Sequence, residues 1–114
     1  MLTFSCKTIS QEDLVRCAFD LNKTEYNVLV FLLKKNERRT ATQISESMKL
    51  DRTTVQKAVK KLVEKGLVKR SQINLSGGGY TFFYKINNRD EIKEKMKNVT
   101  HKWYRRVEEA INML

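Results

Sequence analysis

The spacing of hydrophobic and polar residues along the first half of the chain follows the period of the α-helix. Apolar residues recur at helical intervals over residues 11–20, 23–35 and 41–48. In the middle stretch they occupy most sides, which is typical of a helix at the centre of a core. Ser10 and Asn22 precede the first two stretches, each with an acidic residue three positions later, as in a capping box. The pattern predicts three helices, of which the second is central.

A fourth helix is predicted over residues 52–65. Asp51 can cap its beginning, and Gly66 suits the left-handed residue that commonly ends a helix. The apolar residues that recur in it at helical spacing are Val55, Val59, Leu62 and Val63. The short helix at 41–48, the tight turn after it and the helix at 52–65 together form a helix-turn-helix.

Residues 68–86 have the composition of a β-hairpin. Gly77 to Gly79 separate two β-prone runs, which is a hairpin signal. Four aromatic residues crowd the second run, and they can either stack on unpaired bases or pack against the helices. These residues are Tyr80, Phe82, Phe83 and Tyr84. Because the hairpin has to pack on the helix-turn-helix, we expect at least two of the four to be core residues.

The last segment, residues 88–114, predicts one long helix. Asn88 can cap it, and no breaker interrupts the residues that follow. With a rise of 1.5 Å per residue, the helix should be roughly 38 Å long. Its apolar stripe consists of Ile92, Met96, Val99, Trp103, Val107, Ala110, Ile111 and Leu114. The stripe can pack on its own domain or pair with a second copy, and the length of the helix favours a homodimer.

The predicted fold class is α+β and mostly helical. Residues 1–87 would form a winged helix-turn-helix domain with an N-terminal helix, a recognition helix at 52–65 and a wing at 68–86. Residues 88–114 would form a C-terminal dimerisation helix. A chain of 114 residues with 40% hydrophobic residues can bury one modest core.

Positive charge is concentrated on one part of the chain. The net charge is +10, from 23 basic and 13 acidic residues. Residues 51–70 contain seven basic and two acidic side chains, so they carry half of this excess. A basic balance favours a polyanionic partner, nucleic acid before anionic membrane. The polar face of one basic helix can equally be a solvated surface, but the turn before it and the wing after it favour DNA.

The run TATQISESMKLDRTTVQKAVKKLVEKGLVKR resembles the winged helix-turn-helix core of archaeal TrmB-like regulators and is similar to the MarR group. The resemblance covers residues 21–87, where EKGLV would close the recognition helix and YTFFYKI would form the returning wing strand. It implies a DNA-binding transcriptional regulator. Full-length TrmB regulators also carry a sugar-binding domain, and because nothing follows Leu114 here, sugar sensing is not expected.

The polar side chains of the recognition helix suit contacts with base edges. Arg52 and Lys57 can donate to guanine O6 and N7, and Gln56 can pair with adenine N6 and N7. Thr53 and Thr54 can bind a phosphate or touch a thymine methyl group. These side chains lie at the N-terminal end of the helix, which is the part of a recognition helix that contacts the bases.

Phosphate contacts are predicted on three elements. Lys60 and Lys61 lie toward the C-terminal end of the recognition helix, and Thr42 and Gln43 begin the preceding helix, where free amide groups attract anions. The wing residues predicted to contact DNA are Lys69, Arg70, Gln72, Asn74 and Ser76. In a twofold dimer the two recognition helices would lie about 34 Å apart, which predicts a pseudo-palindromic site in double-stranded DNA.

No combination of residues predicts catalysis, a metal site or a cofactor. Cys6 and Cys17 lack Cys-x-x-Cys spacing, and the single histidine, His101, is far from both in the sequence. There is no nucleophile with a base and no glycine-rich phosphate loop. A disulfide between the two cysteines stays open, although cytoplasmic thiols are generally reduced.

The chain has no apolar run long enough for a membrane span and no signal-like N-terminus, which predicts a cytoplasmic protein. Its basic amphipathic last helix suits a membrane surface, but Glu94, Glu108 and Glu109 oppose that interpretation. The main alternative to DNA binding is a winged-helix module that binds protein or RNA within a larger assembly. A small-molecule effector is neither supported nor excluded.

Overall fold

The computed structural model describes residues 2–114, which fall into two compact units. Leu21–Asn87 forms the winged-helix unit, and the chain through Asp20 together with Asn88–Leu114 forms the terminal unit. The sequence placed the first helix with the winged helix, in a domain of residues 1–87. In the structure that helix packs against the long C-terminal helix and is grouped with it in the terminal unit.

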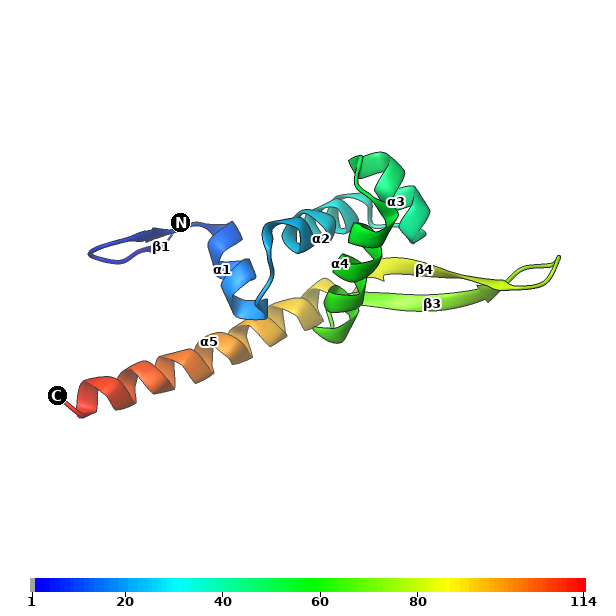
Figure 1. Cartoon of the computed structure of the whole chain (residues 1–114). Coiled ribbons are helices and arrows are strands. Elements are labelled where there is room, and N and C mark those ends of the chain that lie inside the picture. Colours follow the sequence, from blue (N-terminus) through cyan, green and yellow to red (C-terminus); the bar gives the residue numbers. More distant parts are fainter. Residues whose placement is uncertain (1) are drawn as a thin grey trace. The chain divides into compact units, whose positions relative to one another are not determined.

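The winged-helix unit contains three helices and a long hairpin, which can be followed in Figure 1. Its elements are α2 (Lys23–Lys35), α3 (Ala41–Met48), α4 (Arg52–Glu64), β3 (Val68–Asn74) and β4 (Tyr80–Ile86). The predicted bounds of these elements agree with the structure to within one residue. α2 and α3 both pack against α4, and the base of the hairpin completes the core. Its fully buried side chains are Val28, Leu32, Ile44, Val55, Val59, Leu62 and Leu67.

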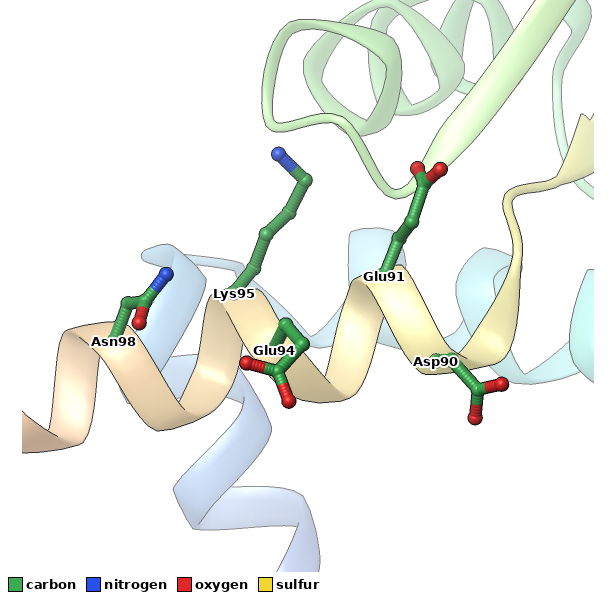
Figure 2. A pocket seen from close by; sticks show the side chains of 5 residues that line it. All are labelled: Asp90, Glu91, Glu94, Lys95 and Asn98. Atoms are coloured by element: carbon green, nitrogen blue, oxygen red, sulfur yellow. The ribbon is translucent and has the colours of Figure 1, made fainter.

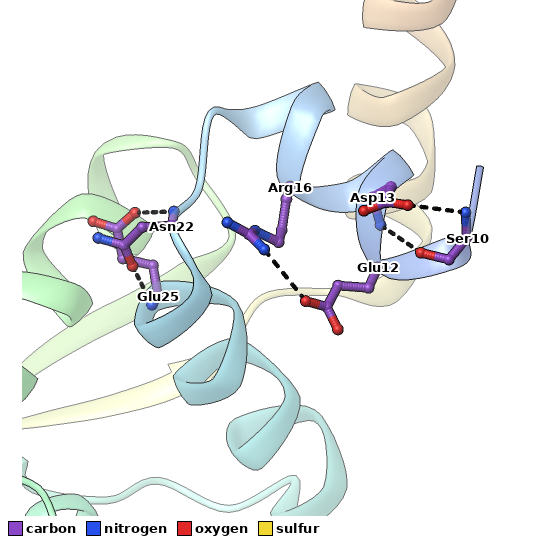
Figure 3. Close-up of polar contacts among 6 residues, drawn as sticks. All are labelled: Ser10, Glu12, Asp13, Arg16, Asn22 and Glu25. Carbon is purple, nitrogen blue, oxygen red and sulfur yellow. Dashed lines mark hydrogen bonds and ion pairs between the residues drawn. The ribbon is translucent and has the colours of Figure 1, made fainter. Parts of the chain in front are cut away.

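Capping boxes fix where the helices begin. At the start of α2, the side chain of Asn22 accepts a 2.8 Å bond from the Glu25 N–H, and the Glu25 carboxylate accepts one of 2.8 Å from the Asn22 N–H (Figure 3). α4 is different, because the predicted cap, Asp51, makes no side-chain hydrogen bond to it. The residue three positions on is Thr54, which has no carboxylate or amide to complete such a box.

The hairpin is held in a defined register. β3 and β4 are antiparallel, from Val68 opposite Ile86 to Asn74 opposite Tyr80. The Asn87 side chain donates a 2.7 Å bond to the Gly66 carbonyl at the hairpin base. Gly66 has a φ of 76°, so it ends α4 in the left-handed conformation as expected.

A single residue before α3 pairs with β4. Arg39 and Tyr84 exchange two backbone hydrogen bonds of 2.8 Å, which makes an isolated antiparallel bridge. The chain just before α3 is therefore attached to the middle of the wing. This bridge joins residues 45 positions apart, and no local sequence pattern signals it.

The terminal unit contains β1 (Leu2–Thr3), β2 (Thr8–Ile9), α1 (Gln11–Phe19) and α5 (Arg89–Asn112). The sequence did not predict the β1–β2 hairpin, because strands of two residues are too short to show an alternating pattern. α1 begins with the predicted capping box (Figure 3), in which Asp13 and Ser10 bond reciprocally. The Ser10 hydroxyl and amide lower the pKa of Asp13 below its ordinary value.

α5 is the long helix that the sequence predicts. The Asn88 side chain accepts bonds from the N–H groups of Asp90 and Glu91, at 2.8 and 3.3 Å. The helix has 24 residues, which corresponds to about 36 Å. None of its residues is buried, although it packs against α1.

Candidate nucleic-acid interface

α4 has one buried and one exposed side. Its buried residues are Val55, Ala58, Val59 and Leu62. The exposed side carries the predicted DNA-binding residues Arg52, Thr53, Gln56, Lys57 and Lys60. The helix is therefore anchored by its apolar face, and these five polar residues are open to solvent.

Two of the residues predicted on this helix have different surroundings. Thr54 is half-buried. The Lys61 ammonium lies 4.0 Å from the Glu25 carboxylate of α2, and the two side chains are 31% and 13% exposed. Lys61 is thus directed toward a carboxylate of its own unit, whereas Lys60 is exposed. An attraction of this length near the surface is weak.

At the start of α3, Thr42 is exposed, while the Gln43 side chain has a structural task. Its carbonyl oxygen accepts a 2.9 Å bond from the Thr40 N–H, and the Thr40 hydroxyl accepts one of 3.1 Å from the Gln43 N–H. This capping box uses the oxygen of Gln43, and the side-chain NH₂ group can still donate. Thr42 is thus exposed without a capping task, and Gln43 keeps its NH₂ group available as a donor.

The register of the hairpin divides the predicted wing residues between its two faces. Side chains directly opposite each other in an antiparallel pair lie on the same face. On one face, three of the four aromatic residues of β4 lie opposite polar residues of β3, in the pairs Arg70–Tyr84, Gln72–Phe82 and Asn74–Tyr80. Lys69 lies on the other face, opposite Lys85. Ser76 belongs to the turn at the hairpin tip.

One of the four aromatic residues of the wing, Tyr84, belongs to the buried core, whereas we expected at least two. Tyr84 is buried, Phe82 and Phe83 are half-buried, and Tyr80 is 59% exposed. The Arg70 guanidinium lies 4.5 Å from the Phe82 ring centroid, and Tyr80 approaches the same ring edge-on at 5.3 Å. Phe82 is therefore covered, and Arg70 is held against the wing by a cation–π contact.

Two basic residues that the sequence analysis did not single out also lie on the wing or beside it. The Arg38 guanidinium lies 4.7 Å from the centroid of the Phe83 ring. Lys85 is exposed on β4. Lys85 could have been identified from the alternation of residues along the strand, but the contact of Arg38 depends on the long-range bridge beside β4.

The predicted dimer stripe of α5 lies open. Ile92, Met96 and Val107 are half-buried. The other residues of the stripe, all exposed, are Val99, Trp103, Ala110, Ile111 and Leu114. Packing on α1 therefore covers only part of the stripe.

The family model described as "Sugar-specific transcriptional regulator TrmB" matches residues 15–100. The chain belongs to the TrmB family. This confirms the resemblance found in the sequence and places the chain in a family of transcriptional regulators rather than of enzymes.

Solved structures confirm the winged-helix fold of this TrmB-family chain. A possible transcriptional regulator from Methanosarcina mazei is 37% identical with a TM-score of 0.92, and the match covers 99% of this chain and 95% of that one. A Staphylococcus aureus MepR mutant bound to an oligodeoxyribonucleotide, from the MarR family, is 12% identical with a TM-score of 0.56, over 91% and 73% of the two chains.

The chain is also similar in sequence to an uncharacterized protein of Methanocaldococcus jannaschii, MJ1503. The two are 33% identical over 90% of this chain and 77% of the length of MJ1503.

A hollow, the cysteines and possible metal ligands complete the description of residues 2–114. A hollow of about 400 Å³ is lined by Asp90, Glu91, Glu94, Lys95 and Asn98 (Figure 2), all on α5 and of mixed charge. Within residues 2–114, no group of side chains could hold a metal ion and no helix could span a membrane. Cys6 and Cys17 are both free and exposed.

Proposed function

We propose that this TrmB-family protein binds specific sequences of double-stranded DNA as a homodimer and thereby regulates transcription. The observation that carries the proposal is the exposed polar face of α4, with Arg52, Gln56 and Lys57 near its N-terminal end and Lys60 beyond them. The DNA-bound MepR structure, which has a similar fold, supports the same use of this architecture.

On this proposal the side chains of α4 have two roles. Arg52, Gln56 and Lys57 contact base edges in the major groove, where each base pair presents its own donors and acceptors. Lys60, Thr42 and the wing contact phosphates, which position the protein without reading the sequence. The buried side of α4 holds both groups on one rigid helix.

Dimerisation is supported by the distribution of exposed apolar residues. Of the ten large hydrophobic residues exposed within 2–114, eight belong to the terminal unit. They are Leu2, Phe4, Val99, Trp103, Tyr104, Ile111, Met113 and Leu114. An aromatic side chain alone contributes ~150–250 Å², so burying the exposed parts of these eight removes on the order of 800 Å² per copy. That is the size of a standard protein interface.

The experiment that tests this proposal is a selection of bound duplexes from a random pool, followed by titration of the winner over a salt series. We expect an enriched inverted repeat with half-sites about one helical turn apart. The logarithm of the binding constant should fall linearly with the logarithm of salt concentration. A protein that enriches no sequence and shows a flat salt dependence does not have this function. Binding to RNA or to an acidic protein instead would identify the interaction module.

A further inference from the structure

The β1–β2 hairpin of the terminal unit receives little cover from its own chain. Its strands have two residues each and form a sheet only with one another. Two backbone hydrogen bonds between Phe4 and Lys7, of 2.7 and 3.3 Å, close its turn. A hairpin of two strands is marginally stable in water unless it packs against a helix or further strands. Because every residue from 2 to 8 is exposed, this hairpin requires a partner surface.

The side chains of the hairpin describe the surface that it needs. Leu2 is 55% exposed and Phe4 is 61% exposed, so both can still bury a large apolar area. The only charged residue between positions 2 and 9 is Lys7. Two apolar side chains with one ammonium group beside them fit an apolar surface that carries carboxylates at its edge.

The C-terminal half of α5 and the residues that follow it have this complementary composition. The large hydrophobic residues exposed there are Val99, Trp103, Tyr104, Ile111, Met113 and Leu114. Beyond Arg106 the chain contains two acids, Glu108 and Glu109, and no basic residue. The segment therefore matches the hairpin both in its apolar side chains and in the sign of its charge.

A single copy of the chain does not bring these two surfaces together. Both belong to the same compact unit, and both are exposed. In Figure 1 the hairpin leaves the start of α1 and stands apart from the C-terminal half of α5. In a twofold dimer, by contrast, the hairpin of each copy can cover the helix of the other, so that the same contact forms twice.

We infer that the β1–β2 hairpin is an arm that crosses to a second copy of this chain and packs Leu2 and Phe4 on the apolar stripe of that copy's α5. Lys7 then lies near the two acids at the end of the same helix. The inference rests on the homodimer of the proposed function and adds to it which surface of one copy meets which surface of the other.

The contact can be detected directly, because Cys6 lies in the turn of the hairpin and Trp103 is the only tryptophan of the chain. One copy carries Cys17→Ser/Trp103→Phe and a bimane dye on Cys6. The other carries Cys6→Ser/Cys17→Ser and keeps Trp103, which quenches bimane at contact distance. Mixing the labelled copy with an excess of the other should cause a loss of bimane emission. The matched control is a second copy that also carries Trp103→Phe, and it should cause no loss.

Light scattering on the same mixtures separates the possible failures. If dimers form and the emission does not change, the hairpin does not reach the other copy's α5, and the inference fails while the homodimer stands. If the protein is a monomer at every concentration, the proposed homodimer fails, and the inference with it. Quenching in a labelled copy that keeps its own Trp103, at a dilution where it is a monomer, would place the hairpin on its own helix and overturn the inference.

A second measurement uses the unlabelled protein. Leu2→Ser/Phe4→Ser should raise the dissociation constant of the dimer on the order of 10²-fold, because each copy loses two apolar anchors. Thr3→Ala/Ser5→Ala, the control in the same hairpin, should leave the constant nearly unchanged. Sedimentation over a dilution series measures both variants, and equal constants for the two would contradict the inference.

Discussion

Lys60 and Lys61 are neighbours in the chain and differ in their surroundings. Lys60 is exposed, whereas the Lys61 ammonium lies 4.0 Å from the carboxylate of Glu25. We predict that Lys60→Ala weakens binding to all duplexes by the same factor and lowers the salt slope by about 1. Lys61→Ala should have a smaller effect on both quantities. Anisotropy titrations of a selected and a scrambled duplex measure this, and equal effects of the two substitutions would contradict the structural distinction.

Gln56 and Lys57 lie on the exposed face of α4, and we predict that they discriminate between bases. Replacing both with Ala should reduce the preference for the selected site over a scrambled duplex by about 1–3 kcal/mol for each base that the two side chains recognise. Binding to the scrambled duplex should fall less, because the remaining phosphate contacts do not depend on sequence. The readout is the ratio of the two binding constants at one salt concentration. A ratio that stays unchanged while both constants fall would make these residues phosphate ligands.

The wing tip has a backbone conformation that favours glycine. Gly78 and Gly79 have φ values of 96° and 79°, while a Cβ at Gly77, Gly78 or Gly79 would have nothing within 4 Å. Any cost of Ala at this tip is therefore a backbone cost. We predict that Gly78→Ala destabilises the protein by about 1–2 kcal/mol, and that Gly77→Ala, the matched control, is neutral or slightly stabilising. Urea unfolding of the two variants measures the difference, and equal midpoints would contradict it.

Most elements could be predicted because their signals are local. Helical spacing together with an N-cap and an acid three positions later gave α1 and α2 to within one residue at each end, and α5 to within two. The failures have non-local or marginal causes. Asp51 is a preferred capping residue, but its side chain makes no hydrogen bond to the start of α4, and no acid or amide stands three positions later to complete a capping box. The Arg39–Tyr84 bridge, and with it the place of Arg38 beside the wing, depends on pairing across 45 positions.

In the candidate site, too, the features with local signals could be predicted from the sequence, and those that depend on contacts between distant residues could not. The exposed face of α4 could be predicted from one helix alone, since a buried Val55 and Val59 fix which residues point outward. The engagement of Lys61 with Glu25 requires the packing of α4 against α2. The two faces of the wing require the strand register, which the sequence does not specify because glycines at the tip allow more than one turn.

For the whole molecule, the decisive property is its assembly state, because on the proposed function a single α4 would read only a half-site. The winged-helix unit has its own core of fully buried side chains, while the terminal unit exposes Trp103 and Ile111, each 58% exposed. We predict that Trp103→Glu/Ile111→Glu converts the dimer into a folded monomer. Light scattering should give a mass near 13.4 kDa instead of twice that value.

The matched control is Asn98→Glu/His101→Glu, which adds the same two acids to α5 away from the stripe, since helical periodicity places these positions on its other side. It should remain a dimer. The stripe variant should keep the affinity of the unmodified protein for an isolated half-site and lose on the order of 10²–10⁴ in affinity for the inverted repeat, because the second half-site is no longer bound intramolecularly. A stripe variant that still scatters as a dimer would place the interface elsewhere. A monomer with undiminished affinity for the inverted repeat would mean that each chain recognises its site alone.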